Sequence, residues 1–217
     1  MSLVAILGLW LVPMLPPVMP SPPVLQQGKK RLMLPDKWQA PAARVFASPM
    51  GAFGFKFFPT DDGKGEGVLF TIDGTGAETE VWRKKLVCTP VEVYVSELGH
   101  VATVDMWGAK GRTHAVVIYD RTGKTVTDLA FNQIFPNESP TTNPFIIETQ
   151  SSIHWTINAD FDFYDAKSVR RFSTADIAVA PVTESGLSLR VRTGWGETIF
   201  FDPDSGRLVK RIKPAHQ

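Results

Sequence analysis

Short apolar runs recur along most of the chain, and within them apolar and polar positions tend to alternate. Gly51–Phe58 is aromatic-rich, and its alternation predicts a β-strand with Phe53, Phe55 and Phe57 on one face and Phe58 on the other. No long stretch repeats apolar residues with the 3.6-residue period of a helix. The pattern therefore predicts an all-β protein and disfavours an α/β fold.

Turns rich in Asp and Gly separate these runs, and β-branched or aromatic residues flank each turn. That combination predicts β-hairpins, because Gly supplies a positive φ and Asp caps a tight turn with its side chain. The predicted turns are Asp73–Gly76, Glu97–Gly99, Arg121–Gly123 and Pro203–Ser205. One helical turn is expected within Leu129–Pro136.

Two of the predicted hairpins share a sequence pattern. VVIYDRTGKTVTDL (Val116–Leu129) and TIFFDPDSGRLVKRI (Thr198–Ile212) both run from an apolar strand through an aromatic residue and Asp to a turn that ends in Gly and a basic residue. A weaker copy surrounds Asp73 and Gly76. The pattern resembles the Asp-x-x-[Thr/Ser]-Gly-[Lys/Arg] hairpin of β-propeller blades of the YVTN and NHL kind. This resemblance covers Val91–Leu129 as one four-stranded blade and Gly186–Ile212 in part, and it implies repeated antiparallel sheets without implying an activity.

Blade length limits the architecture. A blade takes roughly forty residues and a closed ring typically four to eight blades, so Ala43–Gln217 has room for about four at most. SVRRFSTADIAVAPV matches no blade. An open or partial propeller of two or three blade-like sheets, or a two-sheet β-sandwich, is expected.

The N-terminal region differs from the rest of the chain. Residues Leu3–Val12 are almost wholly apolar, and Pro13–Gln27 is proline-rich. The apolar stretch is shorter than the roughly twenty residues of a membrane-spanning helix and matches the core of a secretory signal. We expect a signal-like segment and spacer over residues 1–27, a linker over 28–42 and an all-β domain over 43–217. The protein is then secreted or periplasmic, or tethered to a membrane if the segment is not cleaved.

Composition adds two constraints. The 217 residues include 23 basic and 22 acidic residues, for a net charge of +1. This balance gives no electrostatic reason to expect a nucleic-acid partner. The one cysteine, Cys88, excludes an internal disulfide and is expected to be a small buried apolar residue.

Candidate chemistry is sparse. His100 and His114 begin two strands of the predicted blade with Asp105 between them, and such residues can bind zinc or transfer protons. Their spacing matches no metal signature, and the chain has no Gly-x-Ser-x-Gly elbow and no phosphate-binding loop. A hydrolase or metal-dependent enzyme using these three residues is the alternative function.

The favoured function is a non-enzymatic, extracytoplasmic binding or scaffold module without a cofactor. Its expected binding residues are Trp107, Lys110 and Arg112, on the loop Met106–Thr113, and Trp195 between two glycines. Trp195 is either a stacking platform or a filler between sheets. A protein or saccharide partner is expected, and open sheet edges would allow oligomers.

Overall fold

The computed structural model describes residues 41–165, 183 and 185–214. The chain divides into two units, Met1–Leu32 and Met33–Gln217, and every described residue belongs to the second. The predicted signal-like segment lies outside the described residues. Within the described part of the chain, no helix has the length and apolar character needed to span a membrane.

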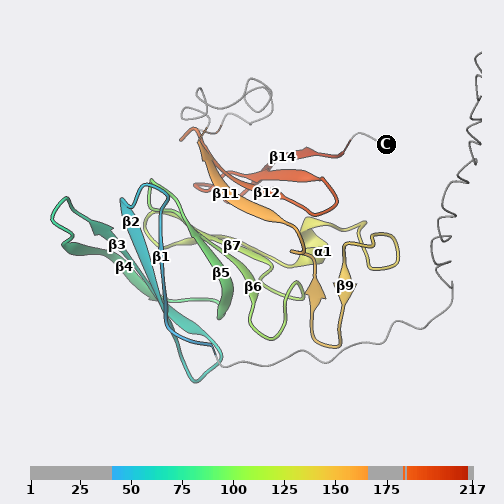
Figure 1. Ribbon diagram of the computed structural model, residues 1–217, viewed down its shortest axis with the longest axis horizontal. Coiled ribbons are helices and arrows are strands. Elements are labelled where there is room, and N and C mark those ends of the chain that lie inside the picture. The colour runs from blue at the N-terminus through green and yellow to red at the C-terminus, as the bar shows by residue number, and fades with distance from the viewer. Residues whose placement is uncertain (1–40, 166–182, 184, 215–217) are drawn as a thin grey trace, which may run out of the picture. The chain divides into compact units, whose positions relative to one another are not determined.

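Three four-stranded antiparallel sheets dominate the second unit, and in each sheet the strands are neighbours in sequence order (Figure 1). The first sheet contains β1 (Arg44–Ala47), β2 (Phe53–Pro59), β3 (Gly65–Ile72) and β4 (Glu78–Lys85). The second contains β5 (Pro90–Val95), β6 (Val101–Met106), β7 (Val116–Tyr119) and β8 (Thr125–Leu129). The third contains β11 (Asp160–Asp165), β12 (Leu187–Arg192), β13 (Thr198–Phe201) and β14 (Leu208–Ile212). None of these sheets closes into a barrel, so the predicted all-β fold of antiparallel blade-like sheets is confirmed.

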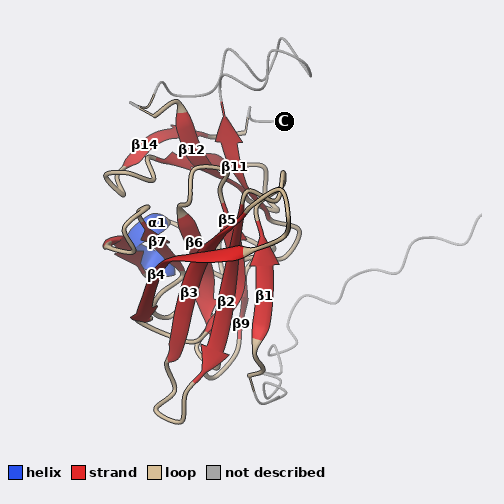
Figure 2. Ribbon diagram, turned by 90° about the vertical axis from the view of Figure 1, so that its left-hand side faces the viewer, coloured by secondary structure: helices blue, strands red, loops and turns tan. Residues whose placement is uncertain are grey.

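Two smaller elements connect the second and third sheets. The single-turn helix α1 (Phe131–Ile134) follows β8, as the sequence predicted, and buries Phe131 and Ile134. A short hairpin of β9 (Ile147–Glu148) and β10 (Ile153–His154) comes next. Figure 2 shows how strongly strands outnumber helix in the described residues.

The hydrophobic core is split into two clusters that share the second sheet. One cluster lies between the first and second sheets and the other between the second and third. Successive residues of β7 alternate between them: Val117 and Tyr119 belong to the first cluster, Val116 and Ile118 to the second. The second sheet therefore lies between the other two, and β5 contacts both β1 and β11, the first strands of its neighbours.

The hairpin that repeats in the sequence occupies the same place in each of the three four-stranded sheets, between the third and fourth strands. In the second sheet, Asp120 Oδ1 accepts the backbone N–H groups of Thr122 and Lys124 at 2.8 and 2.9 Å. Asp73 and Asp202 hold the equivalent turns. Each turn includes a glycine with positive φ: Gly76 (85°), Gly123 (80°) and Gly206 (72°). Each third-to-fourth pairing also carries a register shift. The hairpin is thus a repeated structural unit, while the resemblance to YVTN and NHL blades stays a prediction.

Most predicted strands are present. Phe55 and Phe57 are buried, Phe53 packs against the same cluster, and Phe58 is exposed on the other face of β2, as alternation required. Cys88 is buried, and loss of solvation raises the pKa of its thiol to about 12, so the thiol stays protonated. The sequence did not reveal that β11 completes the third sheet. The segment SVRRFSTADIAVAPV lies outside the described residues.

Candidate binding site

The loop Met106–Thr113 connects β6 to β7 and contacts the β9–β10 hairpin. An Nη atom of Arg112 lies 2.6 Å from Glu148 Oε1 and 3.3 Å from the carbonyl oxygen of Thr149. The carbonyl oxygen of Lys110 accepts the N–H of Ile153 at 2.7 Å. The Arg112 side chain is exposed, and these contacts hold it against the β9–β10 hairpin.

A buried carboxylate at the end of β6 positions this loop. Asp105 is 2 % exposed and has a positive φ of 58°. Its side chain lies between the loop and Trp155. Its Oδ1 accepts the N–H of Gly111 and the indole Nε1–H of Trp155, both at 2.9 Å. Burial raises the pKa of Asp105 to about 6, even though both hydrogen bonds and the charge of Lys110 act to lower it. Asp105 thus holds the loop at Gly111, where the carbonyl oxygen of Gly111 also accepts the N–H of Phe131.

Trp195 lies on the β12–β13 turn, and its ring is half-buried. It meets the ring of Phe135 edge to face, with 5.1 Å between ring centroids, and its Nε1–H donates to Glu197 Oε2 at 3.2 Å. Part of the ring fills space against the core and part remains accessible. Among the described residues, no hydrogen bond, ion pair or ring contact joins Trp195 to Trp107, Lys110 or Arg112, so the four predicted binding residues do not form one cluster. Trp107 is half-buried, and its backbone N–H donates to the carbonyl oxygen of Thr89.

The three residues of the alternative enzyme site do not converge. Asp105 holds the loop, as described above. His114 Nδ1 pairs with Asp128 Oδ1 at 2.7 Å, and His100 Nε2 pairs with Asp204 Oδ1 at 2.8 Å. Among the residues that the structure describes, no group of three His, Cys, Asp or Glu side chains could hold a metal ion.

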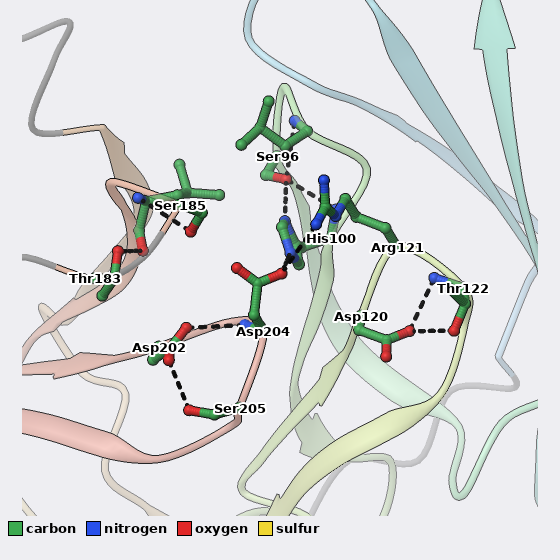
Figure 3. A network of polar contacts seen from close by, with 12 residues as sticks. Ser96, His100, Asp120, Arg121, Thr122, Thr183, Ser185, Asp202, Asp204 and Ser205 are labelled. Atoms are coloured by element: carbon green, nitrogen blue, oxygen red, sulfur yellow. Dashed lines mark hydrogen bonds and ion pairs between the residues drawn. The ribbon is translucent and has the colours of Figure 1, made fainter.

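His100 belongs to a chain of polar contacts between the second and third sheets (Figure 3). Ser96 Oγ lies 3.2 Å from His100 Nδ1, and His100 Nε2 meets Asp204, on the β13–β14 turn. The order Ser–His–Asp resembles a nucleophile with its base and orienting acid. However, Ser96 and His100 are both 0 % exposed, and Ser96 Oγ also accepts the N–H groups of Leu98 and His100 as a turn cap. A substrate carbonyl could not reach Ser96. The contacts of Ser96, His100 and Asp204 instead hold the second and third sheets together.

The charges around Asp204 suit that bracing role. Its burial alone would raise the pKa of the carboxyl, but hydrogen bonds from His100 and Ser185 and the charges of His100 and Arg121 outweigh this and lower it. Arg121 Nη lies 3.6 Å from the carboxylate. Asp204 therefore stays ionised opposite the buried imidazole.

A pocket of about 380 Å³ opens between β14 and the segment that follows α1. Its apolar wall includes Ile134, Phe135, Pro136 and Leu208, and its charged residues are the basic Arg211 and Lys213 and the acidic Glu138 and Glu197. Both carboxylates already have partners, Asn143 for Glu138 and Arg211 for Glu197. Concave sites with an apolar wall and a few polar groups are the usual form of a ligand site.

Glu197 and Arg211 organise the base of the pocket. Glu197 is 3 % exposed, and its Oε1 lies 2.7 Å from an Nη of Arg211. Arg211 also donates to the carbonyl oxygen of Ile134 and lies over the ring of Phe135, 5.2 Å from its centroid. The predicted binding residue Trp195 contacts two residues of the pocket lining, Phe135 and Glu197, although it does not line the pocket itself.

Neither Arg211 nor Glu197 was among the binding residues predicted from the sequence. The hairpin register puts Arg211 opposite Ile199, which faces the core. A basic residue at a core-facing position needs a buried counter-charge, and Glu197 is the acidic residue immediately before β13. That register argument is the signal that could have found the pair.

No protein-family model matches this chain, and no curated protein matches its sequence.

Proposed function

We propose that this protein is a non-enzymatic binding or scaffold module that acts outside the cytoplasm. The proposal rests on the hydrogen bonds and the ion pair that three buried polar side chains form within the protein. Asp105, His100 and Glu197 each hold one part of the frame to another through hydrogen bonds or an ion pair. Groups so engaged favour a rigid frame that presents loops, the usual arrangement of a recognition module.

The proposed contact surface is the loop Met106–Thr113, with Trp107, Lys110 and Arg112. Trp195, which packs against Phe135, is proposed as a second and separate contact. The loop combines an aromatic ring and two basic side chains on a backbone held at Gly111 by Asp105. A contact surface that is already ordered loses little conformational entropy on binding. A protein or saccharide partner would use both features of the loop, the ring for stacking and the charges for polar groups.

The alternative, a hydrolase or metal-dependent enzyme using His100, Asp105 and His114, has no supporting observation. Each of the three residues has a different partner. The chain Ser96–His100–Asp204 is enclosed at its nucleophile end.

The binding role is tested by immobilising the full chain and recovering partners from the cell envelope of its source. We expect Trp107→Ala/Arg112→Ala to lose partners that the wild-type chain retains. Arg192→Ala is the matched control, because Arg192 is also an exposed arginine in one ion pair, with Asp160. Equal recovery by the loop variant and the wild type would remove the loop from the proposal.

The extracytoplasmic part of the proposal depends on the apolar segment Leu3–Val12. Residues 1–42 should export a fused reporter that is active only outside the cytoplasm. The double substitution Leu7→Arg/Leu9→Arg should abolish export, since a charged stretch cannot serve as the apolar core of a signal. Unchanged reporter activity in that variant would contradict this localisation.

A further inference from the structure

β14 is an edge strand, and it differs from the other fourth strands. Among the described strands it pairs only with β13. It exposes Leu208 and Val209, at 39 % and 42 %. Proteins usually protect such edges, because unpaired N–H and C=O groups invite pairing with another chain.

The fourth strand of the second sheet, β8, is covered at one point by the β13–β14 turn. Thr127 Oγ1 donates to the carbonyl oxygen of Gly206. A Cβ atom on Gly206 would lie 2.2 Å from the carbonyl oxygen of Val126. β8 is therefore not open along its length.

In β4, the fourth strand of the first sheet, every charged side chain has an intramolecular partner. Glu78 pairs with Lys56, Arg83 with Glu80, and Lys85 with Asp62. Lys84 donates to the carbonyl oxygen of Gly123. β4 also exposes one aliphatic side chain, Val81 at 44 %, so it differs from β14 in its fully compensated charges.

β14 and its flanks carry charge of one sign. Residues 207–213 read RLVKRIK, with four basic residues and no acidic one. Arg211 is neutralised by Glu197, but the exposed side chains of Arg207 and Lys213 have no hydrogen-bond or ion-pair partner among the described residues. The edge thus retains uncompensated positive charge beside exposed aliphatic side chains.

The pocket lies beside this edge, on the face of β14 that carries Arg211. Side chains of a strand alternate between the faces of a sheet. The register shift in the β13–β14 pairing places Leu208 opposite Phe201, on the same face as Arg211 and Lys213. A strand added next to β14 would therefore place every second side chain on this face, over the pocket.

We infer that β14 is a docking site for an extended, acidic peptide segment of a partner, which adds to the third sheet as a further strand and places alternate side chains over the pocket. Backbone hydrogen bonds to the edge would supply affinity, and Arg207, Lys213 and the apolar wall would supply selectivity. This inference rests on the proposed binding function but uses a different surface from the loop Met106–Thr113.

The test uses the full chain and blocked, fluorescein-labelled peptides, with binding measured by fluorescence anisotropy at low ionic strength. The probe alternates Glu and Val, and the charge control alternates Lys and Val. Two further probes carry backbone N-methyl groups on all Glu or on all Val residues. A strand uses alternate backbone groups toward one edge, so only one N-methylated probe should lose binding.

Two variants with equal charge change locate the site. Arg207→Glu/Lys213→Glu should weaken binding of the Glu–Val probe by about tenfold or more, because both uncompensated charges are reversed. Lys64→Glu/Lys124→Glu, at exposed turn positions of the first and second sheets, should leave it within about twofold. Unchanged thermal unfolding of both variants checks that they fold.

Absence of Glu–Val binding to the wild-type chain would overturn the inference. So would equal weakening in the two variants, or equal tolerance of both N-methylated probes, which would indicate non-specific attraction. The two proposals can fail separately. If β14 binds no peptide but partners are still captured through Trp107 and Arg112, the proposed binding function stands. If partner capture does not depend on Trp107 and Arg112, that result counts against the proposed function.

Discussion

From Val101 to Val104 and from Val116 to Tyr119, every residue of the second sheet is buried and none is charged. The sheets on either side contain strands of another kind. β11 alternates Asp with aromatic residues in its first four positions, and β4 carries five charged residues. The second sheet packs against a neighbour on both faces, whereas each flanking sheet has one apolar face and one face with paired charges.

The charged faces explain how such a stack ends. In the third sheet, Arg190 pairs with Asp162 and Arg192 with Asp160 across the β11–β12 register. In the first sheet, Arg83 pairs with Glu66 and Glu80. Stacked repeat proteins need terminal units with polar outer faces, because an exposed apolar face would aggregate. We infer that the flanking sheets serve as those terminal units here.

The largest expected effect comes from the core of the second sheet. Ile118→Ala should lower the free energy of unfolding by about 3 kcal/mol, because it opens a cavity at a position that is 0 % exposed. Val45→Ala, on the exposed side of β1 where Val45 is 66 % exposed, should change it by less than about 0.5 kcal/mol. Urea-induced unfolding would measure both, and similar losses would refute the contrast between the sheets.

Among the charged residues in the strands of the second sheet, only Asp105 is buried, and this burial predicts an effect of pH on stability. Its pKa is raised from 3.8 to about 6 in the folded state, chiefly by burial, with Glu92 raising it and Lys110 lowering it. Between these values the folded protein binds more protons than the unfolded chain. The contribution of Asp105 to stability is therefore present below about pH 4 and lost as the pH rises through about 6.

Asp105→Asn should remove this dependence while keeping an oxygen for Gly111 and Trp155. A pKa shift of this size corresponds to about 3 kcal/mol. As the pH rises from 4 to 8, the free energy of unfolding of the variant should therefore increase relative to that of the wild type by up to this amount. Asp105→Ala is the control, because it loses both hydrogen bonds at every pH. Parallel stability curves for the Asp105→Asn variant and the wild type would show that the carboxylate is not strained by burial.

Local patterns were sufficient for much of the fold. The repeated Asp and Gly of the third-to-fourth turns, the aromatic alternation of β2 and the helical turn at α1 all depend on residues close in sequence. The missed features join distant segments: β11 pairs with β12 across a long insertion, and His100 meets Asp204, 104 residues away. Local periodicity carries no information on such contacts. The pairing of Glu197 with Arg211 was within reach, since one hairpin register places Arg211 on the core side.

The repeated turn offers a smaller and closely matched comparison. Gly76 and Gly123 occupy the same turn position with φ values of 85° and 80°. A Cβ on Gly76 would meet nothing within 4 Å, whereas one on Gly123 would lie 2.9 Å from the ring of Trp82. Gly76→Ala should therefore cost about 1 kcal/mol, from the left-handed backbone alone.

Gly123→Ala should cost about 1 to 2 kcal/mol more than Gly76→Ala, because the buried Trp82 must also shift. Thermal unfolding of the two variants would measure the difference. Equal losses would mean that the packing of Trp82 on this turn adds nothing to stability, and that the turns of the first and second sheets are energetically equivalent.

The smallest expected effect is in the charged face itself. In a double-mutant cycle, Arg192→Ala and Asp160→Ala should show a coupling of about 0.5 kcal/mol, because both side chains are half-exposed and solvent screens their attraction. High salt should reduce that coupling further. A coupling of about 3 kcal/mol that persists in high salt would mean that this face stabilises the sheet as strongly as the core does. The ion pairs would then be a main source of stability, and not only a polar surface that ends the stack.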